Sequence, residues 1–269
     1  MPLSERLPRA RGHRGHRGGA ILPHRSIWSL RLPKHRMACG LAIALAFTAL
    51  LFVLQPGVAQ AWARQMVWWM NALALPGQFE MPVETQPNLF SLPVPMIDLR
   101  LQDIGLAGAG VHALAAVALW LVAGWLPDSA KPAAFLLRFA VLIHAAAIAY
   151  FVFWPGRFPH SLSSHVAGGL RQSWALMLLT PWLHLCTFYL FPFAVWQRVA
   201  VTAVTLLFLF LLAPLQYASH AALLYLLGLI ALPLLYLLFG VMVPILGLVA
   251  LYGWGMSWHD PAQPAFDRG

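Results

Sequence analysis

The chain has 269 residues, of which 61% are hydrophobic and only 9% are charged, and its mean hydropathy is +0.73. Ordinary soluble domains are about half apolar and about a quarter charged, so this composition excludes a water-soluble globular fold and predicts an integral membrane protein. The formal charge of +9 does not indicate a nucleic-acid partner, because the basic excess is concentrated in residues 1–36 instead of covering a folded surface.

The first 36 residues carry nine Lys and Arg against a single acid, Glu5. Lys and Arg beside the first apolar segment hold that end of a membrane protein in the cytoplasm. We therefore predict a basic, disordered N-terminal segment (1–36) on the cytoplasmic side of a bacterial-type inner membrane. Two alternatives stay open: the segment is a nucleic-acid-binding tail, or Met37 is the true start and the topology signal is much weaker.

Residues 37–60 form an apolar segment that is long enough to cross a bilayer and too long for the core of a removed signal peptide. A retained transmembrane helix is expected there. After it, Trp62, Met66, Trp69 and Leu73 recur at helical spacing, which is typical of a helix lying in the membrane interface. Because tryptophan suits the headgroup level, Trp62 and Trp69 are predicted to contact lipid or a partner protein.

Residues 76–103 form the longest polar connection and are rich in proline. Within it, residues 79–83 and 97–101 alternate between apolar and polar side chains with period two. This pattern predicts a small β-hairpin or extended cap on the extracytoplasmic side.

Residues 104–126 and 132–154 are apolar segments of spanning length joined by a short turn, which predicts an antiparallel helix hairpin. Gly105 and Gly108 give the first helix a small face for close contact with a partner or with lipid. Arg138 lies in the inner third of the second helix and is predicted to reach the cytoplasmic headgroups, where it could contact a phosphate or lipid headgroup.

Residues 155–172 are expected to return to the outer side as a loop. Two further spans are predicted at 173–196 and 199–215, separated by a tight turn at Gln197 and Arg198.

The stretch 218–258 contains no Asp, Glu, Lys or Arg and is too long for one comfortable crossing. A two-helix hairpin turning near 239–244 is favoured, which gives seven spans and an outward C-terminus, and a single long or broken helix is the alternative. The predicted fold is thus an all-α polytopic membrane bundle of six to seven helices over residues 37–258, followed by a tail at 259–269.

No Asp or Glu occurs between Asp128 and Asp260, although several spans lie in that interval. Ionisable groups within the bilayer are expensive and are commonly kept for function, as in proton-coupled transporters. The only cysteines, Cys39 and Cys186, both lie in apolar stretches, so a disulfide framework or a Cys-rich metal site is excluded.

Histidines are the polar groups that lie within the predicted spans. His112, His144 and His184 fall roughly 12 to 17 Å below the outer ends of their helices at the helical rise, so they could meet in one layer. Neutral imidazole binds copper and haem iron, and a haem b or copper site is one hypothesis, with interhelical hydrogen bonding as the other. Additional ligands or an entry path at the outer surface could come from His160, His165 and His220.

The absence of membrane carboxylates and of a nucleophile constellation favours a non-catalytic protein. We predict an accessory or scaffold subunit of a larger cell-envelope complex for assembly, export or electron transfer, with the lipid bilayer and other membrane proteins as partners. The alternatives are a haem- or copper-binding redox protein and a transporter or channel for a neutral or lipidic substrate. Side chains that could line part of such a pathway are Thr180, His184, Thr187, Thr202 and Thr205.

Overall fold

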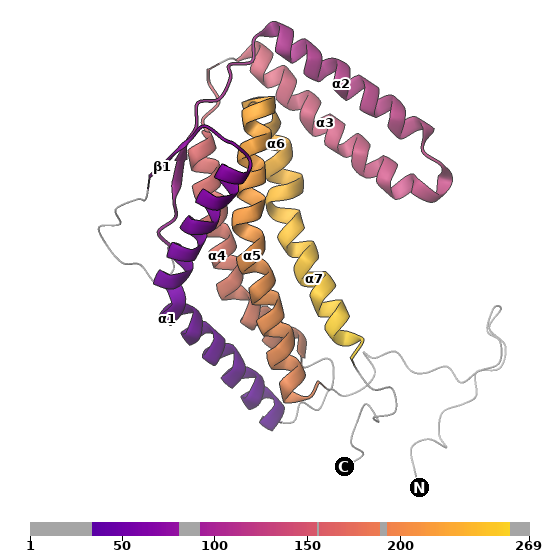
Figure 1. Ribbon diagram of the computed structural model, residues 1–269. Helices are drawn as coiled ribbons and strands as arrows, with labels where there is room; N and C mark the ends of the chain where they lie inside the picture. Colours follow the sequence, from indigo (N-terminus) through magenta and orange to yellow (C-terminus); the bar gives the residue numbers. More distant parts are fainter. Residues whose placement is uncertain (1–33, 81–91, 155, 189–192, 259–269) are drawn as a thin grey trace, which may run out of the picture.

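A computed structural model describes residues 34–80, 92–154, 156–188 and 193–258, and this part of the chain is an all-α bundle with one small sheet (Figure 1). The main helices are α1 (Lys34–Ala72), α2 (Leu106–Trp125), α3 (Lys131–Phe153), α4 (Leu162–Phe188), α5 (Val195–Leu227) and α7 (Met242–Met256). The shorter elements are β1 (Gln78–Glu80), β2 (Met96–Asp98), η3 (Asp128–Ala130), η4 (Leu229–Ala231), α6 (Leu232–Leu234) and the π-helix η5 (Leu235–Val241). Most of the predicted basic segment (1–33) and the tail 259–269 lie outside the described residues.

Five helical segments are long and apolar enough to cross a membrane, and they confirm the predicted all-α membrane class. They are α1, α2, η3 together with α3, α5, and the continuous run from η4 to α7 (Leu229–Met256). The remaining main helix, α4, has 27 residues and carries Arg171, Gln172 and Ser173 in its first half, which makes it more polar. The exact number of spans stays a prediction.

Helix α1 is a single helix of 39 residues, so the separate interfacial helix expected after residue 60 is wrong. Trp62 and Met66 are both 0% exposed, and the Trp62 indole N–H donates to the Phe210 carbonyl of α5 at 2.9 Å. The stripe that Trp62 and Met66 begin continues with Met70 and packs on α4 and α5. Helical periodicity identifies a buried face correctly but does not say whether lipid or protein covers it.

A two-stranded antiparallel sheet forms where the sequence pattern predicts a hairpin, with Phe79 opposite Ile97. The residues between the strands, 81–91, lie outside the described part. Leu92, Val94 and Ile97 are buried, and β2 packs against α4. The sheet is therefore a part of the main core.

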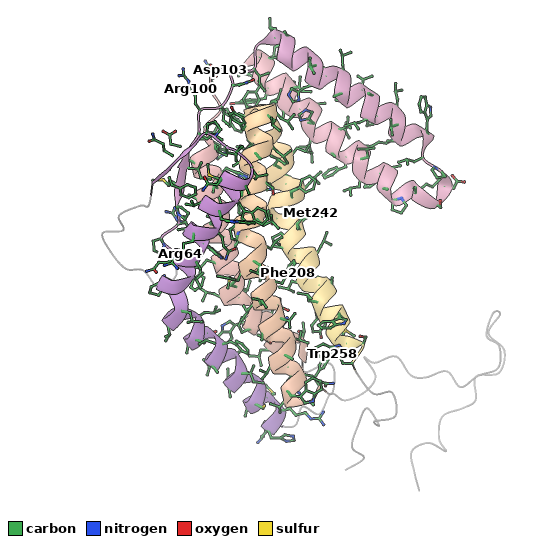
Figure 2. The ribbon with its side chains drawn as sticks, viewed as in Figure 1. Arg64, Arg100, Asp103, Phe208, Met242 and Trp258 are labelled. Carbon is green, nitrogen blue, oxygen red and sulfur yellow. The ribbon has the colours of Figure 1, made fainter. Side chains whose placement is uncertain are left out.

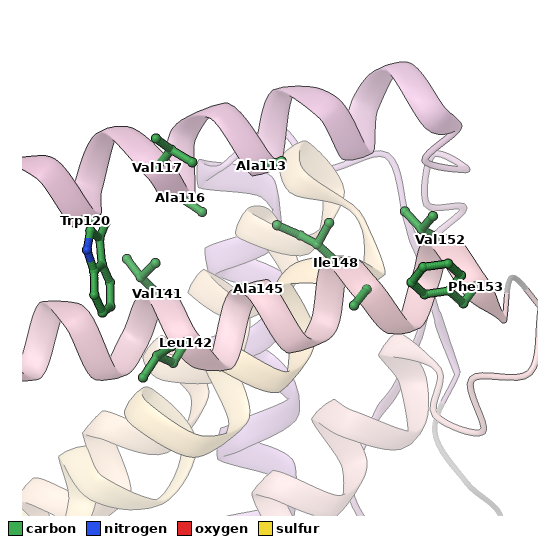
Figure 3. A pocket seen from close by; sticks show the side chains of 11 residues that line it. Ala113, Ala116, Val117, Trp120, Val141, Leu142, Ala145, Ile148, Val152 and Phe153 are labelled. Atoms are coloured by element: carbon green, nitrogen blue, oxygen red, sulfur yellow. The ribbon is translucent and has the colours of Figure 1, made fainter.

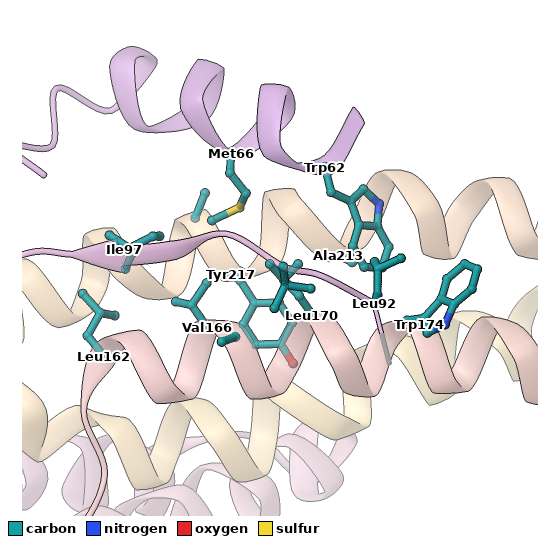
Figure 4. Packing of buried hydrophobic residues seen from close by; sticks show 14 of the residues in the cluster. Trp62, Met66, Leu92, Ile97, Leu162, Val166, Leu170, Trp174, Ala213 and Tyr217 are labelled. Atoms are coloured by element: carbon teal, nitrogen blue, oxygen red, sulfur yellow. The ribbon is translucent and has the colours of Figure 1, made fainter. Parts of the chain in front are cut away.

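The core lies between α1, α4, α5 and this sheet, as Figure 4 shows for Trp62, Met66, Ile97, Leu170 and Tyr217. Gly169 of α4 makes close packing possible there, because a Cβ at this position would collide with the Tyr217 ring. The neighbouring Gly168 faces open space.

Helix α4 begins at Leu162, so most of the segment 155–172 that was expected to be a loop is helical. Ser161 and Ser164 explain this start, because each backbone N–H donates to the hydroxyl of the other, at 3.0 and 3.1 Å. This reciprocal arrangement is a capping box, which satisfies N–H groups that the first turn of a helix leaves unpaired.

The predicted turn at Gln197 and Arg198 is also wrong, since both residues lie in the first turns of α5. Gln197 Oε1 accepts from the Ala194 backbone N–H at 2.9 Å, and its Nε2 donates to the Trp258 carbonyl at 3.2 Å. Arg198 is 4% exposed and donates to the Phe193 and Arg36 carbonyls at 3.2 and 3.3 Å. These bonds place the start of α1, the start of α5 and residue 258 at one end of the bundle.

Residue 258 therefore lies at the same end of the bundle as residue 34. The prediction that the chain leaves the last span on the side opposite to its first helix is wrong. Figure 2 shows Trp258 at this end and Arg100 and Asp103 at the other. The chain does not reverse at 239–244 but passes through the π-helix η5 into α7. Neither prediction for residues 218–258 is observed as made: residues 218–227 complete α5, the chain reverses at Gly228, and residues 229–256 form one broken helical run.

Gln216 of α5 supports this irregular passage. Pro244 has no N–H, so carbonyls one turn before it lack their usual helical partner. The Gln216 Nε2 donates to the carbonyls of Phe239 and Gly240 at 2.8 and 3.1 Å. A side chain from the neighbouring helix thus supplies hydrogen bonds that the proline removes.

Helices α2 and α3, joined by η3, form the antiparallel hairpin that was predicted, and we call residues 106–153 the arm. The arm leaves the bundle at its base and points away from it (Figure 1). The arm meets the bundle along one side of α3, which packs against η4 and α6, while α2 packs mainly on α3.

We expect Gly169→Ala to destabilise the protein by about 1–3 kcal/mol, because the added methyl group overpacks the Tyr217 contact. Gly168→Ala is the matched control and should leave stability unchanged or slightly higher, since alanine is the better helix former. Thermal unfolding of the purified protein in mild detergent measures both. Equal melting temperatures for the two variants would contradict the packing of Tyr217 on Gly169.

Candidate functional site

The three histidines predicted to share one layer separate into two places. His112 and His144 meet between α2 and α3, whereas His184 contacts Thr202 of α5 and the ring of Tyr252 of α7. His144 lies near Leu234, because both line one small crevice. Tyr252, which contacts His184, follows Leu234 by 18 residues, roughly 25 Å of helix at about 1.5 Å per residue. His144 and His184 are therefore far apart along the bundle. One site containing all three imidazoles is not formed.

The His112 and His144 rings form a direct hydrogen bond across the arm. His112 Nδ1 and His144 Nε2 are 3.0 Å apart, and the ring centroids are 5.1 Å apart. Such a bond needs at least one neutral imidazole, because one nitrogen must accept. Among the described residues it is the only side-chain hydrogen bond between α2 and α3, so it fixes their register. The buried Nδ1 of His144 has no hydrogen-bond partner within the described residues.

His184 holds the opposite part of the bundle together. It is buried, and its Nδ1 lies 3.0 Å from the Thr202 hydroxyl. The single hydroxyl proton of Thr202 is directed to the Arg198 carbonyl at 2.8 Å, so the imidazole Nδ1–H is the donor to Thr202. His184 thus links α4 to α5 one turn from the buried Arg198.

A second histidine pair, which was expected to lie at the outer surface, is buried between α4 and α5. His165 Nε2 and His220 Nδ1 are 3.1 Å apart, and the rings stack with an interplanar angle of 18°. Tyr217 meets both rings edge-on, and Tyr236 of η5 meets His165. The placement of His165 and His220 as surface ligands is therefore wrong, while His160 is exposed as expected.

The signal that could have identified this pair is local. His220 follows Tyr217 by three residues and Ala213 by seven, so all three share one face of α5, and this face is buried. On α4, His165 lies one turn before Gly169, where Tyr217 packs.

The facing nitrogens of each histidine pair are hydrogen-bonded to each other. Each pair offers two nitrogens, fewer than the three or four protein ligands that zinc sites use. Within the described ranges no group of three or more His, Cys, Asp or Glu side chains is placed to hold a metal ion. The haem b or copper centre that the sequence suggested stays a hypothesis, and we derive no chemistry through one.

The predicted contact residues occupy different environments. Trp62 is internal, which corrects its assignment to a lipid or partner contact, while Trp69 is half-buried and packs edge-on against the exposed Trp68. Gly105 is exposed at the start of α2, but Gly108 accommodates the side chain of Ile104 from its own segment.

Arg138 lies on the exposed surface of the arm, with its guanidinium 5.5 Å from the centre of the Trp120 ring. Next to it runs a groove of about 550 Å³ between α2 and α3 (Figure 3). Every residue that lines the groove is apolar: Ala113, Ala116, Val117, Trp120, Val141, Leu142, Ala145, Ile148, Ala149, Val152 and Phe153. Sequence reasoning identified Arg138 but not the groove.

We expect the two arm histidines to be energetically coupled. Unfolding of His112→Ala, His144→Ala and the double variant should give a coupling free energy of about 0.6 to 1.7 kcal/mol, the range measured for side-chain hydrogen bonds between membrane helices. Ser219→Ala, which removes an exposed hydroxyl bonded within its own helix, should have little effect. Additive losses at the two histidines would show that the bond does not form in the protein.

Comparisons with known proteins supply no relative: no family model, no curated protein and no solved structure matches the chain. The function is therefore argued from the geometry of this chain alone.

Proposed function

We propose that this protein is a non-catalytic accessory or scaffold subunit of a larger complex in a bacterial-type inner membrane, with its N-terminus in the cytoplasm. Its arm serves as a docking element for a transmembrane helix of a partner protein. The partner helix would lie against the side of the arm that faces α6 and α7.

The observation that carries this proposal is the uncovered arm. In their most apolar stretches, 17% of the residues of α2 and 11% of those of η3 with α3 are buried, compared with 44% for α5 and 17% each for α1 and the run from η4 to α7. Leu114 and Trp125 of α2 are 74% and 83% exposed. A helix pair that belonged to the bundle core would bury one face against it, as α4 and α5 do.

The arm is also preorganised for docking. The His112–His144 bond and the contact of Arg138 with Trp120 hold α2 and α3 as one unit, although the unit meets the bundle mainly along one side of α3. A surface that is already rigid loses less conformational entropy when a partner binds. Helix association within membranes depends on close van der Waals packing, which a fixed helix pair can provide.

The chemistry of the buried polar groups supports a non-catalytic role. No Asp or Glu occurs between Asp128 and Asp260, and the buried histidines described above bond to one another or to a threonine. Each group is used in joining helices.

The same pattern weighs against the transporter alternative. The hydroxyls of Thr180, Thr202 and Thr205 are buried and donate to carbonyls of their own helices at 2.7 to 2.8 Å. Hydroxyls bonded in this way do not line an open polar pathway, so the accessory-subunit proposal is the better supported.

Site-specific photocrosslinking in membranes of the native host tests the proposal. We expect a photoreactive residue at Leu119, which lines the crevice beside Leu234, and one at the exposed Leu246 of α7 to capture the same single protein. The matched control is Leu45, an equally exposed leucine on α1. No discrete product at Leu119, or the same product at all three positions, would contradict docking on the arm.

A further inference from the structure

A basic residue, Arg138, lies at one end of the groove on the arm. On α3, Arg138, Leu142, Ala145, Ala149 and Val152 recur every three or four residues and so lie on one stripe of the helix. Arg138 is the only member of this stripe that is charged, and it stands at the end nearer the hairpin tip. The groove therefore has a cationic end and an apolar length.

The shape of the groove suits a hydrocarbon chain. Its floor is made of small residues, Ala113 and Ala116 from α2 and Ala145 and Ala149 from α3, with Phe153 at the far end (Figure 3). From Val141 to Phe153 the helix rises about 18 Å at about 1.5 Å per residue. One leaflet of a bilayer has a hydrocarbon thickness of about 15 Å, half of the total, so the groove matches one acyl chain.

Arg138 lacks an acidic partner. The one ion pair among the described residues joins Lys131 to Asp128 at the hairpin tip, at 3.1 Å. The guanidinium instead lies over the Trp120 ring and beside Gly124, where a Cβ would touch it. A cation at membrane depth is costly unless an anion or water reaches it, and guanidinium is well shaped to bind phosphate.

We propose that the arm binds an anionic phospholipid, with the lipid phosphate at Arg138 and one acyl chain in the groove. Lys131 lies about 10 Å away along α3, but its charge is paired with Asp128, so Arg138 supplies the contact to the phosphate. The groove itself has no polar side chain to recognise a particular headgroup, so selection is by net negative charge.

The lipid occupies a different side of the arm from the partner helix. All residues that line the groove belong to α2 and α3, whereas Leu234 of the bundle lines the crevice on the other side. Lipid binding is therefore independent of the proposed function, and either proposal can fail without the other.

Native mass spectrometry of the full chain in detergent, mixed with equal amounts of phosphatidylglycerol and phosphatidylcholine of identical chains, tests this inference. We expect wild-type protein to retain phosphatidylglycerol in preference. Arg138→Gln should reduce that preference about fivefold, the effect expected of one basic residue at a membrane surface. Arg171→Gln, at an exposed arginine of α4, is the matched control and should keep it.

Ala149→Leu tests the contribution of the groove separately from that of the Arg138 charge. The larger side chain fills the floor and should lower the retention of both lipids while the circular dichroism spectrum and the melting temperature stay unchanged. Unchanged selectivity in Arg138→Gln, or unchanged retention in Ala149→Leu, would overturn the proposal. A wild-type dimer that Ala149→Leu dissociates would also overturn it, because the groove would then hold a second copy of the chain.

Discussion

Several buried polar side chains bond to one another or to backbone carbonyls, because a hydrocarbon environment supplies no other hydrogen-bond partner. His165 pairs with His220, His112 pairs with His144, and Gln216 reaches the carbonyls that Pro244 leaves free. Each bond joins two different helices, so the same constraint that satisfies these groups also helps to fix how neighbouring helices pack.

The bundle and the arm meet this constraint in different ways. Around α1, α4 and α5, aliphatic, aromatic and methionine side chains form the core, and Gly169 lets Tyr217 approach the α4 backbone. The arm lacks such a core and depends on one histidine pair, one cation–π contact and the packing of two helices. Stability is therefore concentrated in the bundle, while the arm presents most of its apolar surface to its surroundings.

Much of this fold could be predicted from the sequence, because apolar length and turn residues report directly on helices such as α2 and α3. Helix ends were less predictable: Gln197 and Arg198 suggest a turn, yet both bond across the end of the bundle. For the candidate site, depth in the membrane correctly suggested that His112 and His144 meet. It could not place His184, because depth does not determine which helices are adjacent.

The arm has two chemically different sides, and this difference argues that its surface is specialised. A helix pair that only filled lipid could be covered uniformly by large aliphatic side chains, since lipid tails are as apolar as leucine. Here alanines at 113, 116, 145 and 149 leave a groove, and Arg138 lies in line with it. The other side meets Leu234 beside the histidine pair. Small residues make fewer packing contacts, and an arginine within the membrane has a free-energy cost. Because both features lie on the same side of the arm, they favour a bound lipid on that side. The second side is then left for a protein helix.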